Sequence, residues 1–94
     1  MDLAVVNSSS NNISVLLGNG DGTFQTQVTN STGASPLVII TADFNGDGKL
    51  DLATANRNDN NVSILLGDGN GTFRPQVKYT VGTVGPYGIA AADF

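Results

Sequence analysis

The chain of 94 residues contains the same sequence twice. The segment DLAVVNSSSNNISVLLGNGDGTFQTQV at residues 2–28 aligns without a gap with DLATANRNDNNVSILLGDGNGTFRPQV at residues 51–77, which lies 49 positions later. A second pair, SPLVIITADF at 35–44 and GPYGIAAADF at 85–94, is offset by 50 because one residue is inserted near Thr83–Gly85. Repeats of about 20 to 50 residues are typical of arrays in which each unit packs on the next one. The duplication therefore predicts two equivalent structural units that pack on each other.

Each repeat has the pattern of four short β-strands. In the second copy we expect strands at residues 37–44, 50–56, 61–66 and 72–81, separated by polar or glycine-rich turns. Gly, Asn, Ser and Thr are abundant and weaken helices, because short polar side chains compete for backbone hydrogen bonds. Pro75 places the fourth strand at a sheet edge, since proline cannot donate to a ladder. The sequence predicts an all-β antiparallel meander.

A repeat of about 50 residues that forms one four-stranded sheet is the unit of a β-propeller blade. We interpret residues 1–94 as a single module of two blade repeats, repeat 1 at about 2–44 and repeat 2 at about 51–94, joined by a loop hairpin at 43–51. A blade packs on its neighbours through both faces, so two blades leave two apolar faces open. Two blades also cannot close a ring, which needs about four to eight.

The register of the repeats predicts how such a ring closes. The chain begins at the second strand of one blade and ends with the first strand of another, at residues 88–94. We expect this last strand to complete a blade of the next copy, giving a homo-oligomeric ring by strand exchange. A trimer or tetramer would have about six or eight blades. Two alternatives stay open, a fragment of a longer propeller and a designed chain with no function beyond assembly.

The loop between the expected first and second strands is rich in oxygen donors. Asp43, Asn45, Asp47 and Asp51 occupy relative positions 1, 3, 5 and 9, and Lys49 at position 7 offers its backbone carbonyl. Calcium is a hard cation that takes about six to eight oxygen ligands in flexible geometry, whereas magnesium demands a tighter octahedron. The pattern predicts a calcium site.

The same loop has two other interpretations. The first nine positions match an EF-hand loop, but position 12 is Thr54 and the flanks are strands, which excludes an EF-hand sensor. The second is a turn that binds nothing, since Asp, Asn and Gly are common in turns.

The sequence ADFNGDGKLDLATAN…NNVSILLGDGNGTF resembles the FG-GAP/VCBS repeat, the blade of integrin-α-like β-propellers. The resemblance covers essentially the whole chain twice. It implies calcium in the loop between the first and second strands, at the positions of Asp43, Asn45, Asp47, Lys49 and Asp51, and an extracellular or cell-surface location. Asp93 and Asp2 match the ends of a second loop whose middle is missing, so we expect one full calcium site per chain.

The loops at the other end of the blades suggest a ligand. Arg57 and Asn58 lie in one of these loops and Tyr87 in another. Polar groups beside an aromatic ring suit a glycan, and ordinary solvated turns are the plainer interpretation. A carbohydrate-binding lectin is therefore the alternative to a structural scaffold that binds a protein.

Composition excludes several other functions. The formal net charge is −4 and the four basic residues are scattered, so nucleic acid is not an expected partner. The absence of Cys and His excludes nitrogen–sulfur zinc sites and His-based triads. With its acids assigned to a metal, the chain is not expected to be an enzyme. No apolar run approaches the ~18 residues of a membrane helix, so no membrane insertion is expected, and no signal peptide pattern occurs.

Overall fold

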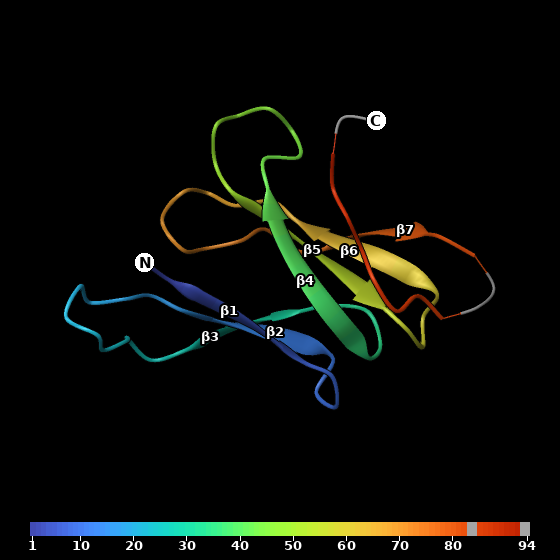
Figure 1. Cartoon of the computed structure of the whole chain (residues 1–94), viewed down its shortest axis with the longest axis horizontal. Coiled ribbons are helices and arrows are strands. Elements are labelled where there is room, and N and C mark those ends of the chain that lie inside the picture. The colour runs from blue at the N-terminus through green and yellow to red at the C-terminus, as the bar shows by residue number, and fades with distance from the viewer. Residues whose placement is uncertain (83–84, 93–94) are drawn as a thin grey trace.

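The computed structural model describes residues 1–82 and 85–92, which form two antiparallel sheets (Figure 1). The first sheet has the order β1-β2-β3, with β1 at Leu3–Asn7, β2 at Asn12–Leu16 and β3 at Val28–Ser31. The second has the order β4-β5-β6-β7, with β4 at Pro36–Ala42, β5 at Asp51–Asn56, β6 at Asn61–Leu65 and β7 at Val77–Thr80. The predicted all-β meander is confirmed. In these residues no helix is long and apolar enough to cross a membrane.

Three strands of the second sheet match their predicted ranges to within two residues, and the fourth is shorter. The predicted strand at 72–81 is reduced to an isolated bridge between Phe73 and Gly67, followed by β7. Pro75 lies in the gap between them, but the first repeat has the same gap, between the Gly18–Phe24 bridge and Val28, with Thr26 in place of proline, so the break belongs to the repeat and not to the proline. Strand β7 is the edge of its sheet, as predicted.

The predicted strand at 88–94 is not formed in the part of the segment that the structure describes. Residues 88–92 are irregular, and no neighbouring strand offers them a ladder. Asp93 and Phe94 lie outside the described residues.

The two sheets share one register. In the first sheet Leu3 is opposite Leu16, and in the second Leu52 is opposite Leu65, 49 positions later in both strands. Strands β1, β2 and β3 are thus the equivalents of β5, β6 and β7. In the described residues the first sheet has no equivalent of β4.

The core lies between the two sheets and uses opposite faces of the repeat. Ile13 and Val15 of β2 pack against Leu52 of β5 and Leu65 of β6, and these four side chains are at most 5% exposed. Ala4, Val6, Leu17, Ile39 and Phe73 pack around them. Because side chains alternate across a strand, β2 contributes its odd-numbered face, while β6 contributes the face equivalent to Ser14 and Leu16. The two sheets therefore pack through non-equivalent faces of the repeat.

Buried polar side chains tie the strands of each sheet together. Asn56 Nδ2 donates to Asn61 Oδ1 at 2.8 Å and to Ser63 Oγ at 2.7 Å, and Ser63 Oγ donates to Gln76 Oε1. Buried polar groups cost free energy unless they are hydrogen-bonded, and here each one satisfies the next. The same hydrogen-bonded series, which we call the polar ladder, recurs in the first sheet at Asn7, Asn12, Ser14 and Gln27.

Replacement of Asn56 by alanine is expected to lower the free energy of unfolding by about 1–3 kcal/mol, because Asn61 and Ser63 lose their donor inside the protein. Urea unfolding of the Asn56→Ala variant measures this loss. Asn58→Ala is the matched control, since Asn58 is exposed and its amide donates only to the Ser35 hydroxyl, at 2.8 Å. Equal losses in the two variants would contradict a stabilising role for the polar ladder.

Candidate metal centre

The candidate calcium loop is the connection between β4 and β5. Strand β4 ends at Ala42 and β5 begins at Asp51, so residues 43–50 form an exposed loop at one end of the second sheet (Figure 1). Gly46 has φ +77° and Gly48 has φ +80°, conformations that side chains with a Cβ rarely adopt. These two glycines allow the loop to wind tightly.

The loop is wound around the carboxylate of Asp43. Its Oδ1 accepts the N–H groups of Gly46 at 2.8 Å and Asp47 at 3.2 Å, and its Oδ2 accepts the N–H of Gly48 at 2.7 Å. These bonds, chiefly the one from Gly48, lower the pKa of Asp43 below its ordinary value. The ionised form, which a metal ligand requires, is therefore favoured.

The next two oxygen side chains fold the loop locally. Asn45 Oδ1 accepts the N–H of Asp47 at 3.4 Å, and Asp47 Oδ1 accepts the N–H of Lys49 at 2.9 Å. Each contact joins a side chain to the backbone two residues on, as in an Asx-turn. The methylene carbons of Lys49 lie close to Gly69, in the hairpin between β6 and β7.

The sequence did not predict that Asp51 is buried and contacts two backbone segments. Its side chain is fully buried, Oδ2 accepts the N–H of Phe44 at 2.9 Å, and Oδ1 accepts the N–H of Gly67 at 2.9 Å. It joins the candidate calcium loop to the β6–β7 hairpin. A Cβ at residue 67 would lie 2.1 Å from the Leu50 carbonyl oxygen, so only glycine fits there.

The repeat itself contained the signal for this contact. Asp2 and Gly18 are the equivalents of Asp51 and Gly67, and Asp2 Oδ1 accepts the N–H of Gly18 at 2.8 Å. Asp2 is exposed, and its predicted partner Asp93 lies outside the described residues. A pair of identical residues kept at one spacing in both repeats could have been interpreted as a contact.

The donor set fits a hard cation, although the carboxylates are not gathered. Within the described residues no three acidic side chains form a group that could hold a metal. The candidate ligand atoms of Asp43, Asn45 and Asp47 are nevertheless oxygens, and the loop already winds around the carboxylate of Asp43. Binding of an ion would have to draw Asp47 and Asp51 toward Asp43, the first of the predicted ligands.

The predicted glycan residues are only partly brought together. The guanidinium carbon of Arg57 lies 4.5 Å from the centre of the Tyr87 ring, within the range of a cation–π contact. Tyr87 is 64% exposed, and Arg57 covers one face of its ring. Asn58 instead donates to Ser35, so its amide nitrogen is directed toward the loop before β4.

Comparison with known proteins agrees with the repeat and its loop. A family model described as the FG-GAP-like repeat matches residues 1–54 and again residues 43–94. Neither the curated proteins nor the solved structures gave a match. The two family matches together span the whole chain, and both include the loop at 43–51. The chain therefore belongs to the FG-GAP-like repeat family, and its two sheets are repeats of β-propeller type.

Proposed function

We propose that this chain is a non-catalytic propeller module that calcium stabilises and that serves as a structural and binding scaffold. The observation that supports it best is the β4–β5 loop, which is wound around Asp43 with oxygen side chains at alternate positions. Of the acids that the structure describes, all but Asp68 accept backbone N–H groups, and Asp68 pairs with Arg74 at 3.3 Å. The extracellular or cell-surface location implied by the family resemblance is part of the proposal.

Calcium would neutralise carboxylate charge in this loop and would hold the loop in one conformation. Asp43, Asn45, Asp47, Asp51 and the Lys49 carbonyl would hold it. The ion would offset the mutual repulsion of three carboxylates that lie within nine residues of one another. Because Asp51 also contacts Gly67, a braced loop would restrain the neighbouring hairpin as well.

Calcium is expected to raise the melting temperature. At a free concentration of about 100 times Kd the gain is about 2.7 kcal/mol, and each kcal/mol shifts Tm by about 4–8 °C in a domain of this size. Calorimetry with calcium and with a chelator measures the shift. Asp47→Asn is expected to remove most of it. Asp68→Asn, in the exposed β6–β7 hairpin, should retain it. Identical melting with calcium and chelator would contradict the proposal.

Asp51 is expected to stabilise the fold even without metal. In chelator, Asp51→Asn should lose about 1–3 kcal/mol, because the amide nitrogen replaces one of the two oxygens that accept backbone N–H groups. Denaturant unfolding measures the loss. Asp2→Asn is the matched control, since Asp2 is exposed and makes the equivalent contact to Gly18 only. An unchanged Asp51→Asn variant would mean that Asp51 serves the metal alone.

The scaffold is proposed to assemble with copies of itself into a ring of three or four chains. Its support is the large apolar side chains exposed on the sheets, such as Leu3 at 46%, Val5 at 45% and Val77 at 50%. Soluble monomers rarely expose such contiguous apolar faces. A ring would bury them and would present the loops at both ends many times over.

A glycan ligand is the second candidate function, which the Arg57–Tyr87 pair favours. A sugar would stack on the face of the tyrosine ring that Arg57 does not cover. Glycan-array binding by the chain, lost in Tyr87→Ala, is the expected result. Tyr79→Ala is the control, because Tyr79 is similarly exposed but lies in strand β7 and not in the loop that contains Tyr87. Glycan binding that survives Tyr87→Ala would exclude this pocket.

A further inference from the structure

One strand edge is open in the first sheet and covered in the second. Strand β5 pairs with β4 on one side and β6 on the other. Its equivalent β1 pairs in the described residues with β2 alone. An open edge exposes a row of backbone N–H and C=O groups that can pair with another strand.

The chain also contains a segment that fits this edge. Residues 85–94 align with 35–44, so Pro86 corresponds to Pro36 and Ile89 to Ile39 of β4. In the structure, residues 85–92 follow the second sheet without joining a ladder (Figure 1). They have strand-like sequence and no strand partner among the described residues.

This segment leaves the second sheet as β4 leaves the first. Ser8 Oγ, after β1, donates to the Pro36 carbonyl at 2.6 Å. Arg57, the equivalent of Ser8, lies against Gly85 and Tyr87, on either side of Pro86. The segment therefore starts where the first strand of a following blade would start.

The apolar faces show the same equivalence. Leu52 and Leu65 are at most 3% exposed because the first sheet covers them, whereas Leu3, the counterpart of Leu52, is 46% exposed, and Leu16, the counterpart of Leu65, is only half-buried. At the other end, Ile64, Leu66 and Val77 are the equivalents of Val15, Leu17 and Val28. With Phe44, Asn45 and Tyr79 they line a shallow hollow on the second sheet. Leu3, Ile64 and Leu66 are thus equivalents of residues packed inside the chain, whereas Val77 is exposed as its equivalent Val28 is.

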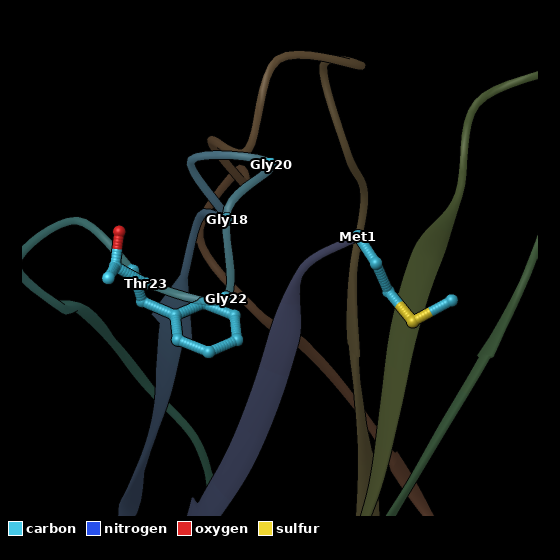
Figure 2. Close-up of a pocket in the computed structure, with 6 residues that line it drawn as sticks. Met1, Gly18, Gly20, Gly22 and Thr23 are labelled. Carbon is cyan, nitrogen blue, oxygen red and sulfur yellow. The ribbon is translucent and has the colours of Figure 1, made fainter.

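The hairpins repeat this relation. Phe73 packs on the core between the sheets, and a Cβ at Gly71 would lie 2.5 Å from Leu17. In the first sheet, Phe24 is 41% exposed. A Cβ added to Gly22, in the same hairpin (Figure 2), would meet no other atom. Phe24 is therefore a projecting side chain whose equivalent Phe73 is partly buried against the core, and the hollow beside Leu66 is the equivalent of the surface beside Leu17 on which that hairpin packs.

We propose that the open edge of β1 is a binding site for residues 86–92 of a second copy of the chain. The proposal rests on the self-assembly in the proposed function and adds the site, the occupant and the register. The β4–β5 pairs transfer directly: Ile39↔Thr54 and Ile40↔Ala53 become Ile89↔Val5 and Ala90↔Ala4. The open face of the second sheet then packs on the open face of the partner's first sheet, with Phe24 in the hollow.

Cysteine cross-linking of the 94-residue chain tests this register, because the native chain contains no cysteine. The double variants Val5→Cys/Ile89→Cys and Ala4→Cys/Ala90→Cys are oxidised and separated without reductant. Of two successive antiparallel pairs, one is of the closer, non-hydrogen-bonded kind, so at least one variant should form disulfides between chains. Most of that variant is expected to shift to covalent dimers and larger species.

The matched controls are Val5→Cys/Ala90→Cys and Ala4→Cys/Ile89→Cys, which slip the register by one residue and turn the cysteines to opposite faces. They are expected to give at least tenfold less cross-linked chain. Circular dichroism and melting of all four variants establish that each is folded. Equal cross-linking in the slipped variants would overturn the proposed register.

Light scattering separates this inference from the proposed function. An oligomer of native chain with cross-linking of an in-register variant supports both. An oligomer in which neither in-register variant cross-links would overturn the edge site while leaving self-assembly intact. A monomer that calcium still stabilises would overturn strand docking and ring formation, and would leave the calcium module.

Discussion

The structure depends on the packing of one sheet face on a different face of the next repeat. Ile13 and Val15 come from one side of the blade, and Leu52 and Leu65 come from the other. Burying an aliphatic side chain contributes about 1.5–3 kcal/mol, so these few contacts supply much of what holds two small sheets together. The two sides have different sequences, and this gives the stack a direction. It also means that the second sheet covers only one face of the first sheet.

The candidate metal loop is connected to that packing through Asp51. The side chain is buried at the start of β5, next to core residue Leu52, and its oxygens hold the backbone of the loop and of the β6–β7 hairpin. The close approach of Gly67 to Leu50 completes this junction. A change in the loop therefore reaches the hairpin that carries Phe73, one of the residues packed on the core.

Much of the fold could be predicted because duplication gives each signal twice. The alternation in Asn61–Leu65 and the turns at glycine set the strands, and Pro75 correctly placed β7 at an edge. The predicted length of β7 was wrong, because the ladder is interrupted after the hairpin in both repeats, with Thr26 as with Pro75, and no residue pattern marks that interruption. The strand at 88–94 could not be judged from its residues alone, since a strand exists only with a partner.

The site was less predictable than the fold. Spacing placed Asp43, Asn45 and Asp47 in one tightly wound loop, and the hydrogen bonds to Asp43 agree with that winding. Spacing did not reveal that Asp51 is buried and engaged on both oxygens. Arg57 and Tyr87 are 30 positions apart, and their contact depends on how residues 85–87 leave the second sheet. Such contacts come from tertiary structure, which one sequence pattern does not contain.

The polar ladder has a consequence for how the repeats can diverge. Asn56 donates to both Asn61 and Ser63, Ser63 donates to Gln76, and the first sheet contains the same four residue types. Neighbouring positions differ freely between the copies, as at Val5 and Thr54 or Ser8 and Arg57. Losing Asn56 leaves Asn61 and Ser63 without this donor, so a single substitution there costs more stability than a paired one. Drift along the chain is therefore uneven, with the ladder holding an older sequence than the loops around it.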